Sequence, residues 1–286
     1  MEYAEQGSGP ALLISHGTSG GYDQGLWLAR ALNLRDVRVI AVSRAGYLRT
    51  PLASGRTPEA MADAFGCLLD ELGMDRAAVL AYSAGGPAAL QFALRHPHRC
   101  AGLVLLSAVS RRVASHAIVR AGSRMLFKWQ PGFPIWLAQG SPVTRTLAAR
   151  VALRALVGQA DLRRLVLRDE TQARLLADLV QSLGIPGLRR AGNLNDERCM
   201  AEMADYPLAR IAVPTLVVHG GADMVVQPDD AVFAARSVPN ATLLLLERGA
   251  HMLPLTHAAA GVSIREFLAR DAEFQSPTFG KEIGLP

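Results

Sequence analysis

Six short apolar runs are spread along the chain, and each has the length of one β-strand. Continuous apolar runs are typical of strands that are covered on both faces of a sheet. Segments with the apolar spacing of helices lie between them, so strand and helix alternate as in a mostly parallel sheet with crossover helices. The predicted strands are residues 11–15, 37–42, 77–82, 103–107, 215–219 and 242–246, and the predicted helices are residues 22–33, 58–73, 84–96, 228–237 and 253–270.

The alternation stops between about residues 109 and 207, where the pattern is helical throughout. A helical block between two strands of a parallel sheet is most simply a lid across the C-terminal edge of the strands. We therefore predict an α/β fold with a mostly parallel, doubly wound core of residues 1–108 and 208–286, and an inserted helical cap of residues 109–207. Within the cap, helices are predicted near residues 113–128, 143–157 and 161–183, with breaks at the prolines at positions 131, 134, 142 and 186.

Composition favours an ordinary globular protein and no nucleic-acid partner. Half of the residues are apolar and 19% are charged, which predicts a substantial buried core. The formal net charge is +5, with 15 Arg and Lys against 8 Asp and Glu in the predicted cap. These basic residues form no run with interleaved aromatics, so the sequence does not indicate nucleic-acid binding.

Targeting and metal-binding signals are missing from the sequence. The segment that begins at Met1 carries Glu2 and Glu5 and has neither the basic nor the apolar region of a signal peptide. No uncharged apolar run approaches the length of a membrane span, and the three cysteines lack the spacing of a metal site. We expect a cytoplasmic protein that acts on a small molecule and needs no metal or cofactor.

Ser83 stands where a predicted strand meets a predicted helix, in the sequence Ala81-Tyr82-Ser83-Ala84-Gly85. This context is typical of a nucleophile elbow, a sharp turn that needs small neighbours because backbones crowd around it. The usual pattern is G-x-S-x-G, and alanine, the next smallest residue, replaces its first glycine here. A serine that caps an ordinary helix is the alternative, and the following elements favour a nucleophile.

A glycine-rich loop, His16-Gly17-Thr18-Ser19-Gly20-Gly21, follows the strand at residues 11–15. An oxyanion hole needs two backbone N–H groups aimed at one point, one after the nucleophile and one from such a loop. We assign these donors to Ala84 and Thr18, with Gly17 as the second choice. A phosphate-binding turn is the alternative, but neither a Lys-Ser/Thr pair nor G-x-G-x-x-G spacing is present. His16 is expected to order the loop rather than to react.

An acid and a histidine each follow a later strand, Asp223 after residues 215–219 and His251 after residues 242–246. A serine hydroxyl is a weak nucleophile that needs an imidazole to take its proton, and the imidazole needs a carboxylate to orient it. Parallel sheets place their sites at the C-terminal ends of strands. We therefore predict Ser83 as nucleophile, His251 as general base and Asp223 as the orienting acid. Asp229 and Asp230, in the first turn of the next helix, are expected to balance its dipole.

The elbow, the His-Gly loop and the strand-terminal Asp and His resemble the α/β-hydrolase superfamily, in particular its serine esterase-like members with a helical cap. The turn Ser43-Arg44-Ala45-Gly46-Tyr47 is similar to the D-x-R-G-x-G turn of that superfamily. The resemblance covers about residues 10–107 and 214–270. It implies an eight-stranded sheet whose second strand is antiparallel. Since few residues precede the strand at residues 11–15, we expect the first strand of that pattern to be shortened or missing.

Members of this superfamily differ in chemistry, so the reaction must be inferred from the residues of the site. A serine nucleophile argues against epoxide hydrolases and haloalkane dehalogenases, which use aspartate. The His-Gly loop matches neither the H-G-G-P-G loop of proline iminopeptidases nor the H-G-G-G loop of lipases. Hydrolysis of a carboxylic ester through an acyl-enzyme is therefore predicted. C–C bond hydrolysis of a β-diketone-like compound is the nearest alternative, and a ligand-binding receptor with little turnover is another.

Three aromatic residues of the cap are candidates for the substrate pocket. Trp129, Phe133 and Trp136 lie in a proline-broken stretch between predicted helices. Large apolar side chains in such a stretch are placed to face a pocket, and packing of the lid against the core is the alternative.

Overall fold

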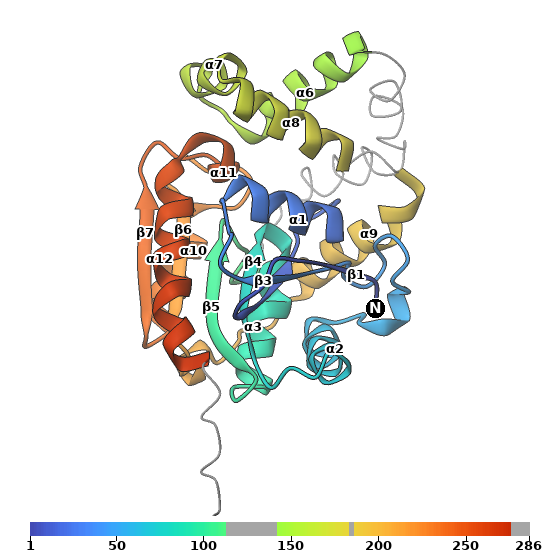
Figure 1. Ribbon diagram of the computed structural model, residues 1–286, viewed down its shortest axis with the longest axis vertical. Helices are drawn as coiled ribbons and strands as arrows, with labels where there is room; N and C mark the ends of the chain where they lie inside the picture. The colour runs from blue at the N-terminus through green and yellow to red at the C-terminus, as the bar shows by residue number, and fades with distance from the viewer. Residues whose placement is uncertain (113–141, 183–185, 276–286) are drawn as a thin grey trace, which may run out of the picture.

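The computed structural model describes residues 1–112, 142–182 and 186–275, and its centre is a seven-stranded sheet (Figure 1). The strand order is β1-β3-β2-β4-β5-β6-β7. Within the described sheet β1 is antiparallel to β3, and the other neighbours are parallel. The strands are β1 (Tyr3–Gln6), β2 (Ala11–Ser15), β3 (Arg38–Val42), β4 (Ala77–Tyr82), β5 (Cys100–Leu106), β6 (Thr215–Gly220) and β7 (Ala241–Leu246).

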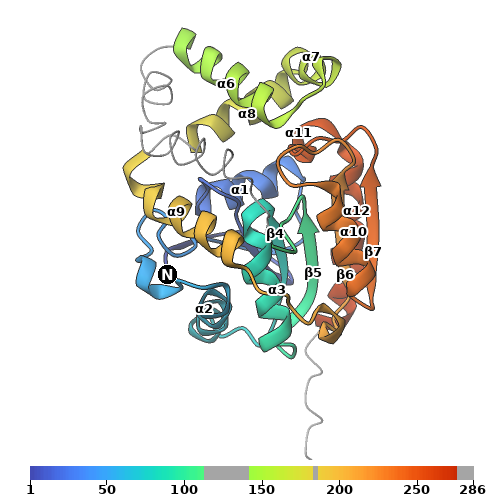
Figure 2. The same cartoon turned by 180° about the vertical axis from the view of Figure 1, so that it is seen from behind.

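Helices cover both faces of the sheet (Figures 1 and 2). Successive strand residues alternate between two hydrophobic cores: Leu12 and Ile14 belong to one core, and Leu13 belongs to the other. This double coverage explains why the strands read as continuous apolar runs. The helices next to the sheet are, in the first core, α1 (Tyr22–Ala31), α11 (Leu253–Thr256) and α12 (Ala258–Gln275), and in the second α2 (Pro58–Glu71), α3 (Gly86–Arg95) and α10 (Pro228–Ser237).

The predicted strands are confirmed within a few residues, with the largest difference at β5, which begins at Cys100. The eight strands implied by the resemblance are corrected to seven in the described sheet. The antiparallel strand is β1, so it holds the place of the second strand in the superfamily pattern. No strand precedes it among the described residues.

Two predicted helices are each divided in two. The helix predicted for residues 253–270 is interrupted at His257, whose backbone is extended, and so forms α11 and α12. The helix predicted for residues 161–183 is interrupted at Asp169, also extended. The Asp169 carboxylate accepts the Gln172 amide at 3.0 Å, as in an N-terminal helix cap, so a new helix starts there.

Four described α-helices lie between β5 and β6 in the chain. The helices α6, α7 and α8 form a layer beyond α1 and α11, whereas α9 runs alongside the core (Figures 1 and 2). Trp27 of α1 ties this layer to the core, because its Nε1 donates to the Leu175 carbonyl oxygen at 2.7 Å. The bounds are α6 (Pro142–Leu156), α7 (Ala160–Arg168), α8 (Glu170–Ser182) and α9 (Pro186–Glu202).

The cap boundaries at residues 109–207 stay a prediction. The helix predicted for residues 113–128, together with Trp129, Phe133 and Trp136, lies outside the described residues. Of the helices in the described part of the chain, none combines the length and the apolar character that crossing a membrane requires.

The backbone crowding after Ser83 leads to a stability prediction. A Cβ on Gly86 would lie 2.1 Å from the Val109 carbonyl oxygen, whereas nothing lies within 4 Å of a Cβ on the exposed Gly158. We expect Gly86→Ala to lower the free energy of unfolding by about 1–3 kcal/mol, because backbone must shift to admit the methyl group. Gly158→Ala, the control, should change it by less than about 0.5 kcal/mol. Urea unfolding measures both, and equal effects would contradict the crowding.

Candidate active site

Ser83 lies in a strained turn between β4 and α3, as the elbow pattern predicts. Its φ is +52°, in the left-handed region that residues with a Cβ seldom adopt. The turn is tightly enclosed: a Cβ on Gly85 would lie 2.2 Å from the Ser15 carbonyl oxygen. The Ser15 hydroxyl in turn donates to the Gly85 carbonyl oxygen at 3.1 Å. This enclosure holds the backbone in the conformation that a nucleophile elbow requires, with the serine at the C-terminal end of β4.

The structure brings Ser83, Asp223 and His251 into one hydrogen-bonded row. His251 Nε2 lies 3.1 Å from Ser83 Oγ, and His251 Nδ1 lies 2.8 Å from Asp223 Oδ2. The three residues follow β4, β6 and β7, and all three are buried. Such a row can carry the serine proton to the imidazole while the carboxylate stabilises the imidazolium.

The Asp223 carboxylate is surrounded by hydrogen-bond donors. Its Oδ1 accepts the amides of Val225 at 2.8 Å and Val226 at 3.0 Å. Its Oδ2 faces His251 and lies 3.4 Å from His219 Nε2. Burial alone would raise the pKa of Asp223, but hydrogen bonds from His219 and His251 outweigh burial and hold the pKa below its ordinary value. Asp223 is therefore ionised, which is the form that orients a histidine.

The sequence analysis did not identify His219. This side chain is fully buried on β6, and its Nε2 donates to the Val226 carbonyl oxygen at 3.0 Å beside Asp223. It thereby ties the loop after β6 to the strand and adds a donor next to the carboxylate. The only signal in the sequence is a histidine within an apolar strand, four residues before the acid.

The two amides assigned to an oxyanion hole come from the elbow and from the loop beside it. Ala84 follows Ser83 directly, and Thr18 follows Gly17, where a Cβ would lie 3.0 Å from Ser83 Cβ. The Gly17 amide, the second choice as donor, already donates to Gln24 Oε1 at 2.8 Å. Among the described residues no hydrogen bond from the Thr18 or Ala84 amide is found. The Thr18 and Ala84 amides therefore remain the candidates to donate to an oxygen of a substrate.

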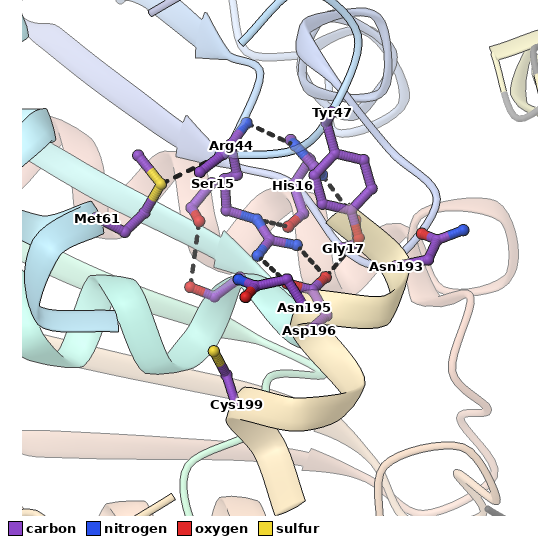
Figure 3. A network of polar contacts seen from close by, with 12 residues as sticks. Ser15, His16, Gly17, Arg44, Tyr47, Met61, Asn193, Asn195, Asp196 and Cys199 are labelled. Carbon is purple, nitrogen blue, oxygen red and sulfur yellow. Dashed lines mark hydrogen bonds and ion pairs between the residues drawn. The ribbon is translucent and has the colours of Figure 1, made fainter. Parts of the chain in front are cut away.

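His16 orders the loop from inside the core (Figure 3). Its Nε2 accepts the Arg44 amide at 3.0 Å, so Nδ1 carries the proton and donates to the Gly17 carbonyl oxygen at 2.6 Å. Burial and the nearby Arg44 charge lower the pKa of His16 well below its usual value, which keeps the ring neutral. His16 has an ordering role, as expected.

Helix α9 supplies a buried acid close to the same loop (Figure 3). The Arg44 guanidinium pairs with both oxygens of Asp196 at 2.6 and 2.7 Å, and the Tyr47 hydroxyl donates to Asp196 Oδ2 at 2.6 Å. Burial disfavours the Arg44 charge, but the Asp196 charge outweighs burial and raises the pKa of Arg44. The sequence analysis placed Arg44 and Tyr47 in a motif turn and gave no role to Asp196.

The site combines groups that are suited to nucleophilic chemistry. No group of three or more His, Cys, Asp or Glu side chains suited to a metal ion occurs within the described ranges. A hydroxyl, an imidazole and a carboxylate converge in the row, and the Thr18 and Ala84 amides belong to the neighbouring loop and to the elbow. They are the components of nucleophilic catalysis with a stabilised oxyanion.

Comparison with known proteins agrees with the fold. The chain is 31% identical over 257 residues to the pimeloyl-(acyl-carrier protein) methyl ester esterase of Aromatoleum aromaticum, covering 87% of this chain and 93% of the relative. The esterase of the same name from Neisseria meningitidis serogroup A is 29% identical over 260 residues, covering 87% and 73%. A solved alpha/beta hydrolase fold protein from Nakamurella multipartita gives a TM-score of 0.78 at 31% identity, covering 95% of each chain.

The family is shown by a match along most of the chain. The model of the family described as "alpha/beta hydrolase fold" matches residues 10–258, which include β2 to β7 and all three residues of the hydrogen-bonded row. Together with the observed sheet and elbow, this match shows that the chain belongs to the α/β-hydrolase family.

Proposed function

We propose that this protein is a serine hydrolase that cleaves carboxylic esters through an acyl-enzyme. The observation that carries the proposal is the buried row from Ser83 through His251 to the ionised Asp223. The names of two relatives, both methyl ester esterases, support the ester as the bond cleaved.

Acylation begins when His251 Nε2 takes the proton of Ser83 as its oxygen attacks the ester carbonyl carbon. Negative charge then develops on the carbonyl oxygen, which accepts hydrogen bonds from the Thr18 and Ala84 amides. The helix that follows the elbow adds its positive N-terminal end at this point. As the intermediate collapses, the bond to the alcohol oxygen breaks, and the imidazolium gives its proton to the departing alcohol. The acyl group remains on Ser83.

Deacylation repeats these steps with water. His251 takes a proton from a water molecule, whose oxygen attacks the acyl carbon, and the same amides hold the oxyanion. Collapse releases the carboxylic acid and returns the proton to Ser83. Asp223 accepts from His251 Nδ1 throughout, which keeps Nε2 facing the serine in both half-reactions.

The proposed function leads to three predictions, and the first concerns the nucleophile. We expect Ser83→Ala to lower kcat/KM for p-nitrophenyl butyrate by at least about 10³-fold, since no hydroxyl remains to form the acyl-enzyme. Circular dichroism and the thermal midpoint should stay close to wild type. A fluorophosphonate should attach to Ser83, as located by peptide mass spectrometry. Retention of a tenth of the wild-type rate, or attachment elsewhere, would exclude Ser83 as the nucleophile.

The second prediction concerns the base and its acid. We expect His251→Ala to be about as damaging as Ser83→Ala, and Asp223→Asn to be milder by about tenfold or more, because the acid acts through the histidine. Asp229→Asn is the control: its carboxylate is 80% exposed and lies 3.5 Å from Arg111, away from the row. The measurement is the steady-state rate of each folded variant with the same ester. Activity lost in the control but kept in Asp223→Asn would overturn the assignment of the acid.

The third prediction separates the reaction classes. With p-nitrophenyl esters of graded acyl length we expect steady turnover, because water can replace the alcohol at the acyl-enzyme. A vinylogous β-diketone should be cleaved much more slowly. Stopped-flow absorbance records both substrates. A faster diketone reaction would favour C–C bond hydrolysis, and a single-turnover burst without steady turnover would favour a ligand-binding protein.

A further inference from the structure

We propose that α9, the last described α-helix before β6, is part of the catalytic apparatus, with Asn193 and Asp196 as positioning residues for the oxyanion loop, residues 16–20. This inference rests on the proposed function and deepens it. The loop and α9 are more than 150 residues apart in sequence and lie together in the structure (Figure 3). Neither residue belongs to the row that carries the proton.

One face of α9 is polar and buried against the loop. Arg189, Asn193 and Asp196 recur at the i, i+4 and i+7 spacing of a single helix face, and all three are buried. Buried polar side chains on a helix require specific partners. The terminal nitrogens of Arg189 donate to the Gly20 carbonyl oxygen and to Asp23. Through Arg189, α9 therefore contacts the last residue of the oxyanion loop.

Asn193 holds the loop directly. Its Oδ1 accepts the Ser19 amide at 2.8 Å, and its Nδ2 donates to the Ser19 hydroxyl at 3.0 Å. Ser19 has a φ of +60°, in the left-handed region, so its conformation needs an external partner to hold it. Because Ser19 follows Thr18 directly, this clamp limits movement of the proposed oxyanion donor.

Asp196 holds the loop through two intermediates. It fixes the Arg44 guanidinium, whose Nε donates to the His16 carbonyl oxygen at 3.0 Å while the Arg44 amide donates to His16 Nε2. His16 Nδ1 then donates to the Gly17 carbonyl oxygen. That carbonyl shares one planar trans peptide with the Thr18 amide, so fixing the oxygen on one side fixes the N–H on the other.

The Arg44–Asp196 ion pair contributes more to the geometry of the loop than to the stability of the fold. The side chains of Arg44 and Asp196 are only 6% and 7% exposed, and buried pairs of this kind can often be replaced by apolar residues without loss of stability. A two-pronged guanidinium–carboxylate pair fixes distance and angle together, which apolar contacts do not. The Arg44–Asp196 pair therefore suits the precise placement of the loop that carries the Thr18 amide.

The test uses Asn193→Ala, a neutral change that leaves no unpaired charge, and Asp196→Asn. We expect each to lower kcat for p-nitrophenyl butyrate about 10-fold or more with KM within about threefold, since loosening an oxyanion donor acts on the transition state. Affinity for phenylboronic acid, whose serine adduct places an oxygen at the oxyanion position, should fall by a similar factor. Asn193→Asp keeps the acceptor for the Ser19 amide and should recover most of the lost kcat.

Glu202→Gln is the matched control, on the same helix. Its carboxylate is 66% exposed and pairs at 3.4 Å with Arg198, and we expect its kcat and boronate affinity to stay within twofold of wild type. If Asp196→Asn fails to fold because Arg44 is left unpaired, Asn193→Ala decides. Folded Asn193→Ala with unchanged kcat and boronate affinity, in an enzyme whose Ser83 still takes a fluorophosphonate, would overturn this inference and leave the proposed function standing. A wild-type protein with neither esterase activity nor labelling of Ser83 would overturn both.

Discussion

The tight turn at Ser83 is the constraint on which the rest of the structure depends. The turn requires a left-handed serine, and it leaves no space for a side chain at Gly85 or Gly86. Residues on both sides must then approach closely, Ser15 from β2 and Val109 after β5. The central position of β4 in the sheet makes this possible, because β2 and β5 are its two neighbours. The elbow is therefore a property of three strands and not of one pentapeptide.

Buried polar groups gather where the strands end, in a protein whose strands are otherwise covered by apolar side chains. Two buried carboxylates among them have several partners each: Asp223 has backbone and histidine donors, and Asp196 has a guanidinium and a phenol. An unpaired carboxylate in such surroundings would cost on the order of several kcal/mol, so each needs its donors in place. The same low dielectric that requires pairing strengthens the electrostatic interactions proposed for the reaction.

The segment between β5 and β6 has two different relations to the core. The layer of α6, α7 and α8 packs beyond α1 and α11, with Trp27 as a link. Helix α9 is fixed to the core loops by buried polar contacts, and its Gly192 lies so close to the Tyr47 ring that a Cβ there would be 2.3 Å away. In its contacts, α9 belongs with the core, although the sequence places it in the predicted cap.

The sequence by itself predicted six of the seven described strands, their alternation with helices, and Ser83, Asp223 and His251 as candidate site residues at strand ends. These features are local: an apolar run, a small-residue turn and a polar residue after a strand can each be recognised from a few neighbours. Ala81 replaces the first glycine of the elbow pattern, and its buried methyl group packs in the core of the second face. The interruptions at Asp169 and His257 were missed because helical spacing continues across them.

Only the tertiary structure decided which distant groups complete the site. Neither Gln24 on the Gly17 amide nor Asn193 and Asp196 beside the oxyanion loop carry a signal of their own in the sequence. For His219, next to Asp223, the sequence offers only a histidine within an apolar strand. Polar residues spaced along a helix usually indicate a solvated face, and here the fold buries that face against residues 16–20. The physical reason is that the contacts of Asn193 and Asp196 join segments more than 100 residues apart. They therefore depend on how the elements pack, which local sequence patterns do not encode.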